Sequence, residues 1–178
     1  MSGLTLVSRA ADFAARQHAG QRRKGAAKEP YINHLAEVAM LLAEATNGEN
    51  AVLVAAGWLH DTVEDTGATR EDIEQLFGEE VAGLVLEVTD DKRLPKAERK
   101  RLQIANAPKK SAGAKQLKLA DKISNLRSLM LSPPDHWERE RLTDYVDWSS
   151  KVVEGCRGVN AVLDRIFDET LHKARESL

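Results

Sequence analysis

The chain has 178 residues, with 26 Lys and Arg against 28 Asp and Glu, so its formal net charge is −2. Apolar residues make up 42% of it and charged residues 30%, which is typical of an ordinary globular domain. This near balance of charge argues against a dedicated nucleic-acid-binding protein. No linker or repeat divides the sequence, so residues 1–178 are expected to form one domain with its own hydrophobic core.

Cysteine content and hydropathy limit the cellular setting. The single cysteine, Cys156, rules out an intrachain disulfide and a cysteine-based zinc ribbon. The longest apolar run, residues 51–59, is far shorter than the ~20 residues that a membrane-spanning helix needs. The first residues do not resemble a signal peptide. We therefore expect a cytoplasmic protein with no membrane or nucleic-acid partner, and the sequence leaves open whether it forms a homo-oligomer.

Helical spacing of apolar residues predicts an all-α protein of about eight to ten helices. The first helix includes residues 6–17, and a loop follows from His18 to Pro30. The second helix is expected to begin near Asn33, a good N-cap residue, and to end before Gly48. Residues 51–63 form the third helix, which is apolar nearly all round and is therefore expected to be buried.

The second half of the chain is also predicted to be helical. Thr69 and Asp72 resemble a capping box that opens a short helix, which Gly78 ends. Further helices are expected at residues 79–88, 96–105 and 114–131, with a loop from Pro108 to Gly113 before the last of them. Residues 135–173 are predicted to form two helices that meet near residues 155–158.

Polar residues with metal-binding chemistry follow the apolar third helix. His60, Asp61, Glu64 and Asp65 lie within six residues, and on one helix they would form two neighbouring polar stripes. Three carboxylates this close repel one another unless a cation lies among them. The alternative is that a buried helix simply ends here and its polar residues meet water.

A second candidate is Asp121, in a helix with an apolar stripe on its opposite side. Lys118 and Asn125 lie about one turn before and after it. Such a polar stripe can be an ordinary solvated face, or it can place Asp121 on a metal ion with Lys118 and Asn125 facing substrate. His34, near the start of the second helix, is a third candidate. Together with His60 and Asp61 these residues form an imidazole and carboxylate set that suits Mn, Fe, Zn or Mg.

Two basic segments are candidates for phosphate binding. The loop sequence Arg22-Arg23-Lys24-Gly25 combines cations with a glycine that allows close backbone approach. The second segment, residues 92–101, contains six Lys and Arg. Acidic residues are interleaved with most of these cations, so a solvated helix face is the simpler interpretation of the second segment.

Five segments in a fixed order carry a resemblance to a known family: HxGQxRK (18–24), PYINH (30–34), LHDTVEDT (59–66), VTDDKRLPKAERK (88–100) and LKLADKISNLRSL (117–129). Together they closely resemble the hydrolase domain of the RelA/SpoT alarmone enzymes. The match is strongest to the stand-alone small alarmone hydrolases, the group that includes the metazoan SpoT homologue. The resemblance extends from about residue 4 to about residue 165.

The resemblance implies a fold, a metal and a set of catalytic residues. The fold is an all-α HD-domain helical bundle. One Mn²⁺ would be bound by His34, His60, Asp61 and Asp121. Glu64 and Asp65 match the catalytic pair that activates the attacking water, and the sequence does not say which of them is the base.

The implied reaction removes pyrophosphate from the 3′ position of ppGpp or pppGpp, giving GDP or GTP, as in the stringent response. The residues matched to substrate contacts are Arg23, Lys24, Lys96, Asn125 and Tyr145. An alternative is an HD-type phosphohydrolase that acts on another nucleotide, such as NADPH at its 2′-phosphate or a nucleoside monophosphate. Loss of a ligand or of the acidic pair would mark a third class, a non-catalytic binding module, but all six positions are intact.

Two positions depart from the family pattern. Leu35 follows His34 where many relatives have proline, and Gly25 follows Lys24 where an acidic residue is common. Neither change removes a proposed ligand. The glycine, however, leaves the geometry of the basic loop undetermined by the resemblance.

Overall fold

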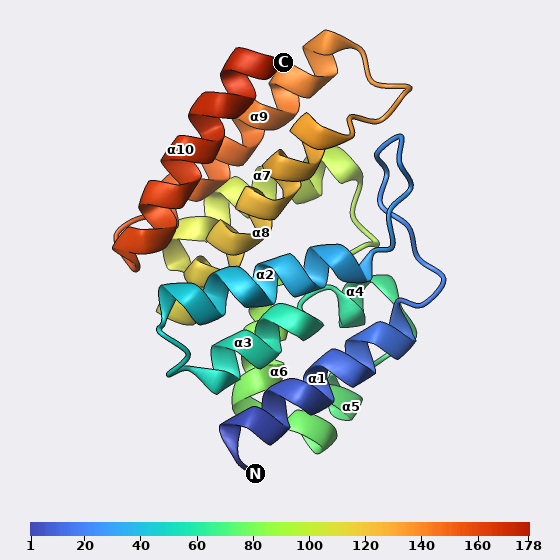
Figure 1. Cartoon of the computed structure of the whole chain (residues 1–178), viewed down its shortest axis with the longest axis vertical. Helices are drawn as coiled ribbons and strands as arrows, with labels where there is room; N and C mark the ends of the chain where they lie inside the picture. The colour runs from blue at the N-terminus through green and yellow to red at the C-terminus, as the bar shows by residue number, and fades with distance from the viewer.

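The computed structural model describes all 178 residues, and it consists of ten α-helices and one 3-10 turn (Figure 1). In chain order these are α1 (Gly3–Gln17), α2 (Ile32–Ala45), α3 (Ala51–Leu59), α4 (Thr62–Asp65), α5 (Arg70–Phe77), α6 (Glu79–Val88), α7 (Lys96–Asn106), η1 (Ala107–Lys109), α8 (Ala112–Leu131), α9 (Arg139–Glu154) and α10 (Ala161–Ser177). There is no strand, and only an isolated bridge pairs Arg22 with Pro30. The all-α prediction is confirmed.

Local sequence signals set several helix ends as predicted. The Thr69 hydroxyl accepts from the amide of Asp72, whose carboxylate accepts from the amide of Thr69, so the capping box opens α5. Gly78 ends that helix with a φ of 93°, a left-handed conformation that favours glycine. The predicted pair of C-terminal helices is confirmed as α9 and α10, which lie side by side in Figure 1.

Two predicted helix starts are displaced. Helix α2 begins at Ile32, so Asn33 lies inside the helix and does not cap it. Helix α8 begins at Ala112 because the hydroxyl of Ser111 caps the amide of Ala114. Gly113 therefore lies in the first turn of α8 and not in a loop.

The predicted third helix is wrong at its C-terminal end. It stops at Leu59, a turn at His60 and Asp61 follows, and Thr62 opens the separate short helix α4. The His60 ring bonds to the backbone at this break, where its Nδ1 donates to the carbonyl of Gly57 at 2.8 Å. In a continuous helix that carbonyl would accept from the amide of Asp61.

Helix α8 is the centre of the fold. It contacts α2, α3, α6, α9 and α10, and more than half of its side chains are buried. The buried set includes the polar residues Lys118, Asp121, Lys122 and Ser124, so this face is not the solvated one that the simpler interpretation required. The remaining core is one contiguous cluster of apolar side chains, in which Leu35 is fully buried.

In Figure 1 α9 and α10 lie toward the end of the molecule that carries the C-terminus, and α1 and α5 lie toward the end that carries the N-terminus. In the same view the N-terminal end of α2 and the short helix α4 lie between these two groups, and α2 packs against α8. None of the helices combines the length and the hydropathy that crossing a membrane requires.

Candidate functional site

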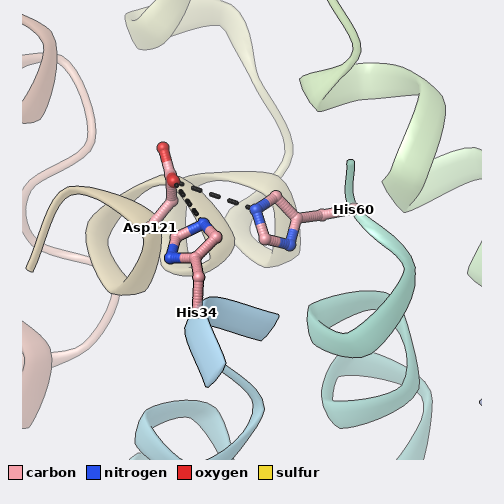
Figure 2. A group of neighbouring side chains, drawn as sticks. All are labelled: His34, His60 and Asp121. Carbon is pink, nitrogen blue, oxygen red and sulfur yellow. Dashed lines mark ion pairs between the residues drawn. The ribbon is translucent and has the colours of Figure 1, made fainter. Parts of the chain in front are cut away.

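Three buried side chains from distant parts of the chain meet at the centre of the molecule. His34 comes from the first turn of α2, His60 follows α3, and Asp121 comes from α8 (Figure 2). Asp121 Oδ1 lies 3.3 Å from His34 Nε2 and 3.8 Å from His60 Nε2. One ligand atom from each residue lies within 4.8 Å of the other two, a separation that a single metal ion can bridge.

Asp61 adds a second carboxylate to this cluster. Its Oδ2 lies 3.1 Å from His60 Nε2 and 3.7 Å from His34 Nε2. The hydroxyl of Tyr31 donates to the same oxygen at 2.5 Å and thereby fixes the carboxylate. All four residues of the predicted ligand set are thus brought together, and their donor atoms are two imidazole nitrogens and two carboxylate oxygens.

Both imidazole rings are held so that Nε2 points into the cluster. The Nδ1 atom of His60 donates to Gly57, and the Nδ1 atom of His34 lies 2.9 Å from the Ser124 hydroxyl. Because Ser124 donates its own proton to Glu37 at 2.6 Å, it accepts from His34. The Nε2 atoms are buried and have no hydrogen-bond partner, which is the arrangement expected of histidines that bind a metal ion.

The electrostatics of the cluster favour a cation. Burial lowers the pKa of His34. Burial also disfavours protonation of His60, but the carboxylates of Asp61 and Asp121 raise its pKa to about 10. The pKa of Asp121 lies well below its usual value, although burial opposes this, because Lys122 and the two imidazoles surround it. Positive charge between the rings is therefore stabilised, and a divalent ion fits this donor set.

Removing the hydroxyl of Ser124 is expected to weaken metal binding without removing a ligand. Ser124→Ala leaves Nδ1 of His34 without its partner, and losses of this kind cost about 10- to 100-fold in metal affinity. Metal titration of the metal-depleted protein measures the effect. Ser149→Ala is the matched control, because Ser149 is also buried but donates to the Tyr145 carbonyl in α9. Equal affinity of the two variants would contradict the proposed role of Ser124.

A pocket of about 550 Å³ opens beside the cluster. Asp61 and Asp121 form part of its wall, whereas His34 and His60 lie behind it. The other predicted site residues all line it: Arg23, Lys24, Glu64, Asp65, Lys96, Asn125 and Tyr145. Ten Lys and Arg side chains line the pocket against six Asp and Glu, although the whole chain is slightly acidic. The pocket is therefore suited to a multiply charged anion.

Glu64 and Asp65 differ in their surroundings. Glu64 Oε2 accepts from the amide of Asp90 at 2.9 Å, and burial raises the pKa of the Glu64 carboxyl. Asp65 is paired with Lys92 through one oxygen and accepts from Gln21 at 3.0 Å through the other. The break between α3 and α4 means that these residues do not continue two stripes of one helix, as the sequence had suggested. They reach the pocket from α4 instead.

Arg23 is held against α8 by two neutral acceptors. It donates to Ser128 Oγ at 3.0 Å and to Asn125 Oδ1 at 3.1 Å. Asn125 Nδ2 donates in turn to Asp121 Oδ1 at 2.7 Å, so this amide links the basic loop to the metal cluster. No carboxylate lies within ion-pair distance of Arg23, and its positive charge remains available to a ligand.

Gly25 brings the basic loop close to the end of α8. A Cβ at this position would lie 2.2 Å from the carbonyl oxygen of Ser132, which is far inside van der Waals contact. The amide of Ala27 donates to Ser132 Oγ at 2.8 Å and secures the loop there. The departure at Gly25 is therefore matched by a close approach that only glycine allows.

Gly25→Ala is expected to displace the basic loop and weaken substrate binding. The added methyl group forces Gly25 and Ser132 apart and moves Lys24 with them. We expect KM to rise about tenfold, the size of one displaced charge contact, with a smaller change in kcat. Steady-state kinetics measure the effect. Gly20→Ala is the control, since a methyl group there meets nothing within 4 Å. An unchanged KM in Gly25→Ala would contradict the role of the close approach.

Several pocket and support residues were missed by the sequence interpretation. Tyr31 fixes Asp61 and stacks on the buried His18, with ring centroids 5.3 Å apart. Lys122 pairs with Asp121 Oδ2 at 2.9 Å and lies over the Trp148 ring. The only sequence signal for these residues was their place inside the motifs PYINH and LADK. Nothing in the sequence indicated Trp148.

Comparisons with known proteins agree with this architecture. A family model described as the HD domain matches residues 10–146. The chain is 52% identical over 158 residues to the guanosine-3′,5′-bis(diphosphate) 3′-pyrophosphohydrolase MESH1 of Drosophila melanogaster, covering 88% of each protein. It is 50% identical over 155 residues to the Homo sapiens protein of the same name, covering 87% of each.

Solved structures give the same result. One, described as a metazoan ortholog of SpoT that hydrolyzes ppGpp, matches with a TM-score of 0.91 and 46% identity over 97% of each chain. A second, lmo0812 of Listeria monocytogenes, matches with a TM-score of 0.67 and 31% identity over 82% of this chain and 95% of the other. The chain therefore belongs to the HD-domain family and, within it, to the group of small SpoT homologues that these metazoan relatives represent.

Proposed function

We propose that this protein hydrolyses the 3′-pyrophosphate of ppGpp and pppGpp, giving GDP or GTP and pyrophosphate. One observation carries the proposal: the buried cluster of two imidazoles and two carboxylates lies directly beside a basic pocket. Relatives of about 50% identity that cover most of this chain are named for the same reaction.

The ligands of the metal in this proposal are His34, His60, Asp61 and Asp121, and the ion is Mn²⁺. Imidazole nitrogens and carboxylate oxygens suit this ion, and the group has no thiolate. Such an ion, when bound, polarises a phosphoryl oxygen and lowers the pKa of water. Mn²⁺ binds its ligands less tightly than Zn²⁺ does, and we expect it to lower the pKa of water less. A protein side chain that accepts the proton of the attacking water is therefore needed more.

Glu64 is the proposed general base. It lies in the pocket wall, and its raised pKa makes it a better proton acceptor than an ordinary surface carboxylate. It takes a proton from the water that attacks the phosphorus atom bonded to the 3′ oxygen. The bond between that oxygen and phosphorus breaks, the 3′ oxygen takes up a proton, and pyrophosphate is released. Asp65 is already hydrogen-bonded to Lys92 and Gln21, and its proposed role is to hold these two side chains in position beside Glu64.

The proposed substrate contacts follow from charge and position. Arg23 and Lys24 from the basic loop and Lys96 from α7 face the pocket and offset the charge of the polyphosphate. Each well-placed contact of this kind is worth about 3 kcal/mol when it strengthens in the transition state. The Asn125 amide is hydrogen-bonded to both Arg23 and Asp121 and so holds these two side chains in position. Tyr145 contributes an aromatic surface from α9.

A substrate panel with separate detection of pyrophosphate and orthophosphate tests this proposal. The purified protein loaded with Mn²⁺ is expected to release pyrophosphate and GDP from ppGpp. Release of orthophosphate from NADPH or a nucleoside monophosphate, with no pyrophosphate from ppGpp, would contradict it.

A further inference from the structure

Helix α7 presents a basic face to the pocket. Its pocket-lining side chains are Lys96, Arg99, Lys100 and Gln103, which recur at helical spacing. Glu98 and Arg101, on another face of the same helix, pair with each other. No residue of α7 is fully buried, and Ile104 is its one partly buried apolar side chain that packs against the hydrophobic core.

Arg99 differs from the other arginines in this segment because its guanidinium has free donors. Its Nε is buried and has no hydrogen-bond partner. Its nearest carboxylate oxygen is Glu64 Oε1, 3.8 Å from Nη1, which is too long for a hydrogen bond. By contrast, Arg93 and Arg101 form paired hydrogen bonds with Asp91 and Glu98, at distances from 2.6 to 3.2 Å. The free donors of Arg99 therefore lie beside the proposed base.

Several cations gather around Lys96, which lies about one turn from Arg99 on the same helix. Burial, and then the charges of Arg141, Lys24 and Arg99, lower the pKa of Lys96. The basic loop and α7 thus bring like charges toward one cavity, where they repel one another. A ligand with several negative charges relieves that repulsion, and a planar guanidinium binds two phosphate oxygens at once.

We propose that Arg99 is a further substrate-binding residue, which donates its free N–H groups to the 3′-diphosphate on the side of the pocket occupied by Glu64. This inference rests on the proposed function and adds to Lys96 a second substrate contact from α7. Arg99 contacts the diphosphate itself, and it does not serve mainly as a partner of Glu64.

Inhibition by inorganic pyrophosphate tests the assignment in the metal-loaded protein. Arg99→Ala is expected to raise the inhibition constant of pyrophosphate and the KM of ppGpp roughly 10- to 100-fold, the cost of a lost charge-assisted contact. Arg99→Lys, which keeps the charge and loses the planar fork, is expected to lie between Arg99→Ala and the parent. Arg101→Ala is the matched control, because it removes an exposed arginine from the same helix but outside the pocket.

A role that acts only through Glu64 gives a different result. In that case Arg99→Ala lowers kcat and leaves pyrophosphate inhibition unchanged, which would overturn the proposal. Calorimetry removes the ambiguity by comparing pyrophosphate binding to metal-loaded Glu64→Gln with binding to the Glu64→Gln, Arg99→Ala double variant. The double variant is expected to bind at least tenfold more weakly, a difference of about 1.4 kcal/mol.

The calorimetry experiment tests Arg99 even if the protein does not hydrolyse ppGpp. Because Arg99 is not fully buried and its ion pair with Glu64 is long, at 3.8 Å, Arg99→Ala is expected to unfold close to the temperature of the parent, which thermal denaturation checks. The binding measurements require no turnover. Absence of ppGpp hydrolysis by the parent protein would therefore contradict the proposed function, whereas equal pyrophosphate affinities would overturn the assignment of Arg99.

Discussion

Replacing His60 or Asp121 by alanine is expected to abolish divalent metal binding and ppGpp hydrolysis together. Each substitution removes one donor from a buried cluster and leaves the remaining charges without compensation. In Asp121→Ala, Lys122 and Asn125 also lose their hydrogen-bond acceptor. Elemental analysis of the purified variants and pyrophosphate release from ppGpp measure the two losses.

His172→Ala serves as the control for this pair. His172 lies on α10, its side chain is 74% exposed, and its nearest carboxylate is Glu176. It is expected to keep the metal content and the activity of the parent. A full complement of metal in His60→Ala and in Asp121→Ala would show that the ion is bound elsewhere, and the proposed site would be wrong. Circular dichroism establishes that each variant remains helical.

Glu64→Gln is expected to retain the metal ion and to reduce turnover by about 10²- to 10⁴-fold, the range typical for loss of a general base. Glutamine has nearly the same shape and can still accept from the amide of Asp90, so the local structure should persist. It cannot take up the proton of the attacking water. Single-turnover kinetics with the metal content determined in the same sample measure the effect.

Asp65→Asn provides the comparison that identifies the base. Both oxygens of Asp65 are already engaged, by Lys92 and by Gln21, so its loss should disturb positioning more than proton transfer. We expect a smaller fall in kcat than for Glu64→Gln. If Glu64→Gln hydrolysed ppGpp at the parent rate, or if Asp65→Asn were the more damaging change, the base assignment would be wrong.

The candidate ligand residues were predictable from the sequence, but the hydrogen bonds that orient them were not. His34, His60, Asp61 and Asp121 stand out because polar residues of metal-binding chemistry adjoin apolar helices. The chain from His34 through Ser124 to Glu37 joins residues that lie 87 or 90 positions apart. Serine and glutamate on a helix have no local signal that distinguishes such a contact from exposure to solvent.

The break after α3 shows where local pattern is insufficient. Apolar periodicity favoured a continuous helix through Val63, because it contains no information about what the His60 side chain binds. In the structure Nδ1 of that ring donates a hydrogen bond to the Gly57 carbonyl, and Nε2 points toward Asp61 and Asp121. The helix thus ends where the His60 ring bonds to a carbonyl of its own helix, a side-chain contact that apolar periodicity does not encode.

In residues 92–101 the charge pattern predicted solvent exposure for side chains that partly line the pocket. Interleaved acidic residues made a solvated face the simpler interpretation of residues 92–101, and for Arg93 and Arg101 that interpretation is confirmed. Lys96, Arg99 and Lys100 instead line the pocket. The side of the helix that faces the pocket depends on how α7 packs against α9, which charge pattern alone does not determine.

The central claim is that four side chains bind one divalent ion, and anomalous diffraction from crystals grown with Mn²⁺ tests it most directly. The account predicts a single strong peak at about 2.0–2.3 Å from His34 Nε2, His60 Nε2, Asp61 and Asp121, as expected for such ligands. A peak that any of these four residues fails to contact, or no peak in crystals of active protein, would contradict it.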